Sequence, residues 1–87
     1  MKNEKRFLTA VFSPDLRTLA TGIEDGSVLL WEVGTGKMLR NLKGHRGPVS
    51  HLASSDDGRL LDSESSDGTA LVWDLKNRDS QEGNKPP

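Results

Sequence analysis

The sequence predicts an all-β protein made of two copies of one small antiparallel sheet. Three observations carry this prediction. The chain repeats itself at a fixed spacing, short apolar runs alternate with turn-forming Gly, Pro, Asp and Ser, and no stretch shows the periodicity of a helix.

The repeat has a spacing of 42 residues and needs no gap. It places the following residues on one another: Ser13 on Ser55, Asp15 on Asp57, Arg17 on Arg59, Leu19 on Leu61, Asp25-Gly26 on Asp67-Gly68, Leu29 on Leu71 and Trp31 on Trp73. Conservative matches accompany them: Thr21 on Ser63, Ser27 on Thr69 and Glu32 on Asp74. A register kept through turns and strands indicates two copies of one supersecondary unit.

The first copy reads as four strands, expected at 7–12, 18–23, 27–33 and 37–42. Pro14 presets φ in the turn after the first strand. Asp25-Gly26 tolerates positive φ and predicts a hairpin between the second and third strands. The sequence GTG at 34–36 supplies the last turn.

The second copy repeats the first three strands, at 48–53, 59–64 and 69–75. No apolar residue follows Leu75 and the chain ends in Pro-Pro, which predicts a disordered polar tail over 76–87. The expected organisation is a lead-in at 1–5, a first unit at 6–43 and a second, incomplete unit at 44–75 that lacks its outer strand.

The third strands are apolar on both faces. Val28 and Leu30 alternate with Leu29 and Trp31, and the second copy shows the same pattern. Such strands are typically covered on both sides, so we expect small sheets stacked against one another.

Composition limits the function further. The 87 residues allow one small domain, 12 Lys and Arg interleave with 13 Asp and Glu, and there is no cysteine. These numbers argue against a nucleic-acid or membrane-surface binder and exclude disulfides and thiolate metal sites. No apolar run is long enough for a membrane span or a secretory signal, so the expected location is cytoplasmic or otherwise intracellular.

Three short motifs identify a family. Gly44-His45 stands before the first strand of the second copy, "SSDG" at 65–68 fills its hairpin, and "VWDL" at 72–75 closes its third strand. These motifs and the spacing resemble WD40 repeats, which form the blades of β-propellers. The resemblance covers residues 6 to 75 and implies a partial β-propeller of two WD40-type antiparallel four-stranded blades.

The resemblance also implies a structural hydrogen-bond network. In the second blade it would consist of His45, Ser63, Asp67 and Trp73, and in the first blade of Thr21, Asp25 and Trp31. An indole N–H only donates, so a buried Trp needs an acceptor such as a hydroxyl, and an imidazole can then connect the hydroxyl to the carboxylate. We expect a satisfied network of this kind to make each sheet rigid.

Both copies depart from the family pattern. The first has Asn3 where the second has His45, so its network is expected to be incomplete. The second has Asp62 and Glu64 where small residues are usual, and Ser54 where Phe12 stands in the first. Buried unpaired carboxylates are costly, so either these two acids find partners or their face is not fully covered.

For several groups of residues a structural role is favoured over a catalytic or ligand-binding one. His45, Ser63 and Asp67 are the residue types of a hydrolase triad, but no G-x-S-x-G motif is present. The sequence GTGK at 34–37 lacks the remaining Walker residues. The spacing of the His, Asp and Glu residues fits no metal framework, and Asp62 with Glu64 as an acid–base pair lacks a pocket. We therefore expect no enzyme activity, cofactor or metal.

The expected function is a protein–protein interaction scaffold. The family binds partners through loops at the blade ends, and the matching residues are Lys5, Arg6, Glu24, Arg46 and Ser66. The alternative is a structural piece of a larger propeller with no independent activity.

The number of blades indicates how the chain is expected to assemble. Propellers close with about four to eight blades, and two blades leave two lateral faces and an outer strand edge open. The chain starts too close to its first strand to donate a spare one. The expected partners are other proteins or further blades, from a parent chain or from a homo-oligomer that completes the ring.

Overall fold

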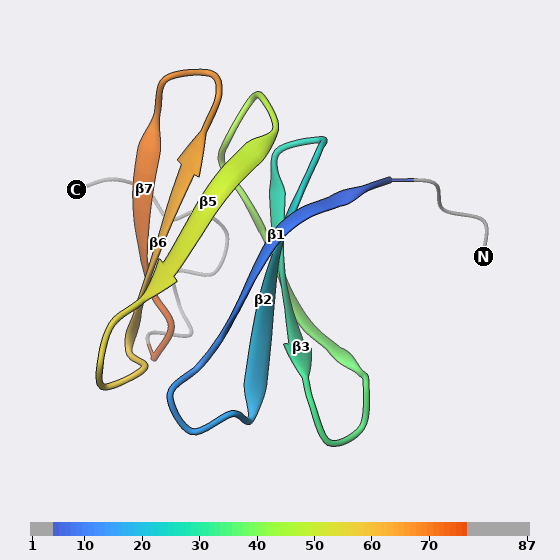
Figure 1. The fold of residues 1–87 in the computed structure, drawn as a ribbon, viewed down its shortest axis with the longest axis vertical. Helices are drawn as coiled ribbons and strands as arrows, with labels where there is room; N and C mark the ends of the chain where they lie inside the picture. The colour runs from blue at the N-terminus through green and yellow to red at the C-terminus, as the bar shows by residue number, and fades with distance from the viewer. Residues whose placement is uncertain (1–4, 77–87) are drawn as a thin grey trace.

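The computed structural model describes residues 5–76, which form seven strands in two antiparallel sheets (Figure 1). The strands are β1 (Phe7–Phe12), β2 (Thr18–Ile23), β3 (Ser27–Glu32), β4 (Met38–Lys43), β5 (Val49–Ser54), β6 (Leu60–Ser65) and β7 (Ala70–Asp74). The first sheet has the order β1-β2-β3-β4 and the second the order β5-β6-β7. The predicted all-β class and strand order are confirmed, with strand ends that differ by at most one residue.

Two sequence predictions fall wholly or mostly outside the described residues. Asn3 lies there, and so does the predicted tail apart from Lys76, which follows β7 in a turn.

Strand pairing repeats with the sequence. Thr9 pairs with Gly22 in the first sheet, and His51 pairs with Glu64 in the second, 42 residues further along. A register shift follows Phe7 in β1, and the same shift follows Val49 in β5. The repeat therefore extends from residue types to backbone pairing, including its irregularity.

The β1–β2 and β5–β6 turns also repeat their hydrogen bonds. The Ser13 hydroxyl donates to the Asp15 carboxylate over 2.7 Å, and that carboxylate accepts the amide of Arg17 over 2.9 Å. Ser55 and Asp57 form the same pair at 2.7 Å. These short polar residues satisfy the turn amides locally, which explains why the turn sequences can be recognised before any fold is known.

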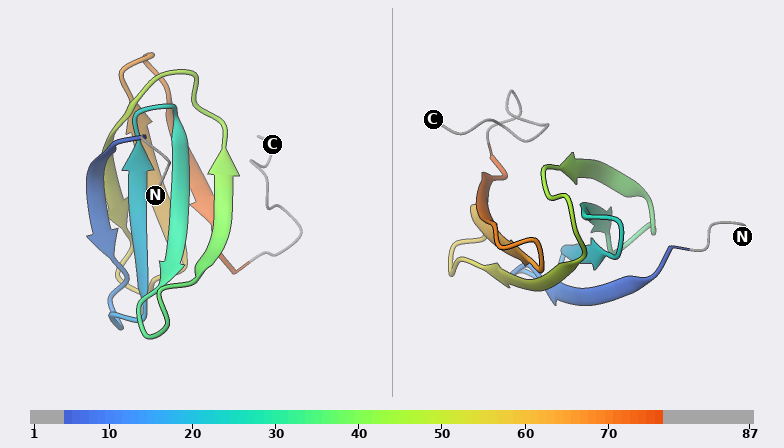
Figure 2. Two further views of the ribbon diagram at one scale, coloured as in Figure 1. Left: turned by 90° about the vertical axis from the view of Figure 1, so that its right-hand side faces the viewer. Right: turned by 90° about the horizontal axis from the view of Figure 1, so that it is seen from above.

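The core lies between the sheets. The first sheet contributes Ala20, Val28, Leu30 and Leu42, and the second contributes Val49, Leu52, Leu61 and Trp73. Strand β5 lies against β1 and β2, and the view from above shows β1 and β5 side by side (Figure 2). The closest approach is at Gly22, where an added Cβ would lie 2.6 Å from Cγ1 of Val49. A side chain there would hold the sheets apart.

Each sheet covers only one face of the other, so the expectation that both faces of the third strands are covered is not met within residues 5–76. The inner face of β3, with Val28 and Leu30, is buried, whereas Trp31 on its other face is half-buried. In β7, Trp73 is buried but Val72 is 63% exposed. The reason is geometric, since two stacked sheets have one interface between them and an open face on either side.

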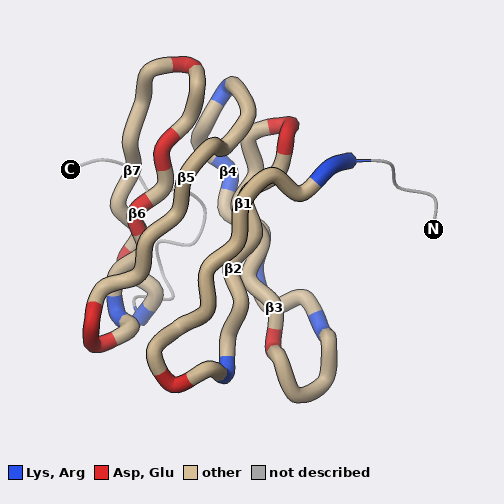
Figure 3. Tube along the Cα trace, viewed as in Figure 1, with Lys and Arg blue, Asp and Glu red and all other residues tan. Residues whose placement is uncertain are grey.

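Asp62 and Glu64 lie on one of these open faces. Glu64 is exposed and Asp62 is half-buried, and Figure 3 shows acidic positions along β6. The sequence left two possibilities for these acids, that they find partners or that their face is not fully covered. The structure shows that their face is not fully covered.

Candidate functional site

A chain of side-chain hydrogen bonds runs through the second sheet from Trp73 to the β6–β7 turn. The Trp73 indole N–H donates to Oγ of Ser63 over 2.9 Å, and this oxygen lies 2.7 Å from Nε2 of His45. Nδ1 of His45 lies 2.8 Å from Oγ1 of Thr69, whose hydroxyl donates to the Asp67 carboxylate over 2.5 Å. Ser63 is fully buried and His45 is buried, so solvent does not compete for the bonds at Ser63, whereas the bond from Thr69 to Asp67 is exposed.

The direction of the chain follows from what each group can donate. Trp73 only donates, and an ionised Asp67 only accepts. Thr69 gives its one hydroxyl proton to Asp67, so its oxygen accepts from Nδ1 of His45. With the proton on Nδ1, Nε2 can accept the Ser63 hydroxyl proton, a tautomer assigned from the partners.

Thr69 is the residue that sequence reasoning missed. The expected direct bond between His45 and Asp67 is wrong, because the threonine hydroxyl stands between them. Asp67 also accepts the backbone amides of Thr69 and Arg46 over 2.8 Å each. The repeat could have pointed to Thr69, because it aligns Thr69 with Ser27 and so places a hydroxyl residue directly after each Asp-Gly.

The first sheet contains part of this arrangement. The Trp31 indole donates to the Thr21 hydroxyl over 3.0 Å. Asp25 does not connect to that pair. It accepts the Ser27 amide over 3.0 Å and forms an ion pair with Lys5, with Nζ and Oδ2 2.8 Å apart. The turn aspartate is thus tied to the entering chain in both sheets, through an ammonium in the first and through the Arg46 amide in the second.

These contacts stabilise the charged forms of both aspartates. The Lys5 side chain lowers the pKa of Asp25 from 3.8 to about 2, with help from Ser27. Bonds from the Thr69 hydroxyl and the Arg46 amide hold the pKa of Asp67 well below its usual range. Both hairpin turns therefore carry a fixed negative charge at neutral pH.

The five predicted partner-binding residues lie around the end of the molecule that holds the β2–β3, β4–β5 and β6–β7 loops, which we call the loop end (Figure 1). Arg46 and Ser66 are exposed there and Glu24 is half-buried. The Arg6 carbonyl accepts the Glu24 amide over 3.0 Å, and the Pro48 carbonyl accepts the Ser66 amide over 3.1 Å. Lys5 differs from the other four because its ammonium is paired with Asp25.

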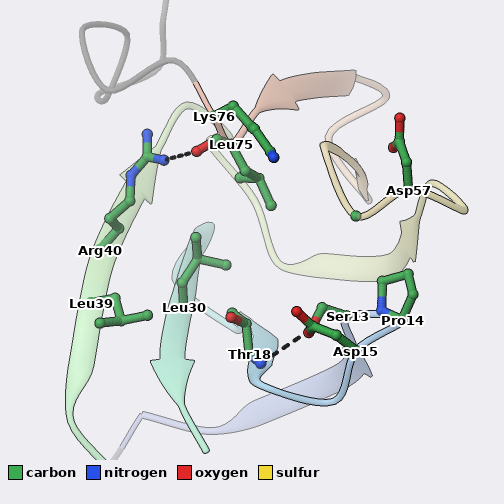
Figure 4. A pocket seen from close by; sticks show the side chains of 11 residues that line it. Ser13, Pro14, Asp15, Thr18, Leu30, Leu39, Arg40, Asp57, Leu75 and Lys76 are labelled. Carbon is green, nitrogen blue, oxygen red and sulfur yellow. Dashed lines mark hydrogen bonds between the residues drawn. The ribbon is translucent and has the colours of Figure 1, made fainter.

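The opposite end has a cavity of about 330 Å³ between the two sheets (Figure 4). Its lining includes apolar side chains from Leu30, Leu39 and Leu75. Arg40 donates from Nη1 to the Leu75 carbonyl over 3.3 Å, and so joins β4 to the segment after β7. This hydrogen bond links the two sheets. No feature of the sequence indicated it.

The other site interpretations can be compared with the geometry. Residues 34–37 form the hairpin between β3 and β4, where the Thr35 hydroxyl donates to the Glu32 carboxylate over 2.8 Å. Strand β4 follows, where a phosphate loop would lead into a helix. Within residues 5–76 no group of three or more His, Asp or Glu is placed to hold a metal ion. No helix in that range could cross a membrane.

The sequence is similar to that of several larger proteins. WD repeat and SOCS box-containing protein 1 of Homo sapiens is 47% identical over 66 residues, which are 75% of this chain and 16% of that protein. The Periodic tryptophan protein 2 homolog of Schizosaccharomyces pombe is 36% identical over 74 residues, which are 84% of this chain and 9% of that protein. The chain thus spans a small part of the relatives it matches.

The fold is similar to a solved propeller. The crystal structure of the Myceliophteria thermophila Cps50 (Swd1) beta-propeller domain matches with a TM-score of 0.82 at 29% identity, over 86% of this chain and 23% of that one. The family profile described as "WD domain, G-beta repeat" matches residues 3–32 and 36–74. With two profile matches, two repeated sheets and a propeller as structural neighbour, the chain belongs to the WD40-repeat family and forms two neighbouring blades of a β-propeller.

Proposed function

We propose that the chain is a non-catalytic protein–protein interaction module whose partner binds at the loop end. The observation that carries this proposal is a contact between the two blades. A Cβ placed on Gly26 would lie 2.5 Å from the carbonyl oxygen of His45. The hairpin of the first blade therefore rests directly on the entry loop of the second, and the exposed side chains of both share one surface.

This surface has a rigid support. The Asp67 carboxylate fixes the Arg46 amide, and Lys5 with Asp25 fixes the start of the first blade. Exposed side chains on a fixed backbone bind at a lower entropic cost than side chains on a mobile loop. The side chains of Arg6, Glu24, Arg46 and Ser66 are the candidates for contact, with Lys5 in a supporting role.

The type of partner follows from charge. Acidic and basic residues alternate around the molecule (Figure 3) and give a net charge of −1. A mixed surface of this kind favours a protein partner over nucleic acid or an anionic membrane. An intracellular location is part of the same proposal and is supported by the absence of cysteine.

The non-catalytic part of the proposal is supported by the burial of Ser63. The contact between Ser63 and His45 looks like the nucleophile and base of a hydrolase. However, Ser63 has no exposed surface, and its oxygen already accepts the Trp73 N–H. A substrate carbonyl could not approach that oxygen in this structure. A fluorophosphonate probe that labels Ser63 in the folded chain would contradict this part of the proposal.

A second candidate function is supported by the two open faces and by the small share of each relative that the chain spans. On that interpretation the two blades are a structural part of a larger propeller, and no partner binds to them alone.

The experiment that separates the candidates is affinity capture with the full chain and two variants. Arg46 and Arg17 both donate a backbone amide to a turn aspartate, and both are exposed, but they lie at opposite ends of the molecule. We expect Arg46→Glu to lose a captured protein that Arg17→Glu retains. Equal capture by wild type and both variants would contradict binding at the loop end, and capture of nothing above background would favour the structural role.

A further inference from the structure

The two open lateral faces of this molecule are not equivalent. The Trp31 face, on the first sheet, is apolar and carries Phe7, Ala10, Phe12, Leu19 and Trp31 around a shallow hollow of about 470 Å³. The acidic face, on the second sheet, carries His51, Ala53, Asp62, Glu64, Ala70 and Val72, as the strand register shows. This difference concerns the sides of the blades and does not depend on partner binding at the loop end.

The internal interface shows what a neighbour on the Trp31 face must look like. Gly22 of the first sheet packs against Val49 of the second and has no room for a Cβ, and Ala20 is buried in the same core. In the 42-residue repeat, the face of the first sheet at this interface corresponds to the acidic face of the second sheet. The face of the second sheet at this interface corresponds to the Trp31 face. A neighbour stacked in the same way would place its own Gly22-like position over Phe7, the counterpart of Val49.

A second copy of this chain cannot provide that surface. Its acidic face has Glu64 where Gly22 stands and Asp62 where Ala20 stands. Glu64 would overlap with Phe7, because even a Cβ at the matching internal position would lie 2.6 Å from Val49. Asp62 would enter a position where Ala20 is buried, and an unpaired buried carboxylate is costly.

We propose that Asp62 and Glu64 prevent copies of this chain from stacking head to tail. The Trp31 face instead takes an antiparallel β-sheet from outside this chain, with Gly and a small apolar residue at the two matching positions. The mechanism is exclusion of a wrong partner through steric overlap and a desolvated charge.

The test is to give this chain the missing surface. In the full chain, the double variant Asp62→Ala/Glu64→Gly should associate, with a mass by light scattering that rises over a concentration series. The fluorescence of the half-exposed Trp31 should shift to the blue as the face is covered. The control Asp56→Ala removes an exposed carboxylate elsewhere and should behave like wild type. Adding Phe7→Glu to the associating variant should return it to the mass of wild type.

Two results would overturn the proposal. If the double variant and its control showed the same mass at every concentration while near-ultraviolet circular dichroism showed both to be folded, the acids would not be the barrier. If wild type itself associated and Phe7→Glu abolished that association, the Trp31 face would accept a copy of this chain. The second measurement needs only wild type and one substitution on an exposed residue, so it holds even if the double variant does not fold.

Discussion

Trp73 connects the packing of the second sheet to its hydrogen bonds. The indole is 4% exposed and donates to a serine that is itself fully buried. We predict that Trp73→Phe lowers the free energy of unfolding by about 1–3 kcal/mol, because it leaves the Ser63 oxygen without its donor. Urea denaturation measures this directly.

The matched control for this prediction is Trp31→Phe. Trp31 makes the same bond to Thr21 but lies on the open Trp31 face. The Thr21 hydroxyl is buried, but the Trp31 ring beside it is half-buried and borders the open hollow. Water can therefore replace the lost N–H, and the replacement should cost about 1 kcal/mol or less. Equal losses for the two variants would show that burial does not strengthen the second network.

Leu16 occupies a backbone conformation that does not suit it. Its φ is 63°, and Gly58, at the same place in the other repeat, has a φ of 75°. A residue with a Cβ pays about 1–2 kcal/mol in this region, and the Leu16 side chain is exposed. We predict that Leu16→Gly raises the melting temperature, by an amount reduced by the entropy of the more flexible unfolded chain. Leu16→Ala keeps the Cβ and should give no gain, so a rise in both variants would point to the lost side chain rather than to φ.

At the scale of the element, the hairpin turns make stability depend on pH. The pKa of Asp25 is lowered in the folded state to about 2 by Lys5. A lowered folded pKa contributes stability above the ordinary value of 3.8, and this contribution disappears as pH falls from there to about 2. Asp67, Asp15 and Asp57 have pKa values shifted in the same direction by their turn bonds. Stability should therefore fall steeply below pH ~4.

The variant Asp25→Asn tests this origin of the acid sensitivity. It should cost about 1 kcal/mol or less at neutral pH, because the ion pair is partly exposed and screened. It should also flatten the dependence of the unfolding free energy on pH between 4 and 2. Asp56→Asn changes an exposed acid in the β5–β6 turn and serves as control. An unchanged slope for Asp25→Asn would exclude the Lys5–Asp25 pair as a contributor.

At the scale of the whole molecule, the two sheets depend on contact at Gly22. A Cβ there meets side-chain atoms of both Val49 and Thr9 at less than 3 Å. We predict that Gly22→Ala costs about 1–3 kcal/mol by forcing the blades apart. Gly34→Ala, where an added Cβ meets nothing within 4 Å, should change stability by about 0.5 kcal/mol or less. Thermal denaturation of the two variants gives the comparison, and equal melting temperatures would contradict a tight interface at Gly22.

The sequence by itself determined what depends on local chemistry. Turn residues such as Ser13, Asp15 and Asp25 satisfy amides two to five positions away, and strands alternate with a period of two, so the repeat predicted the strands and their pairing. The resemblance to WD40 repeats implied the pair of Trp73 and Ser63, which lie on adjacent strands.

Only the tertiary structure decided what depends on contacts across loops and between sheets. Thr69 between His45 and Asp67, Lys5 on Asp25 and Arg40 on Leu75 join segments whose distance in space no repeat or period specifies. The tertiary structure also decided which face of each strand is buried. A strand that is apolar on both faces indicates burial of both, but the face that the second sheet covers is the one where Gly22 leaves room for Val49.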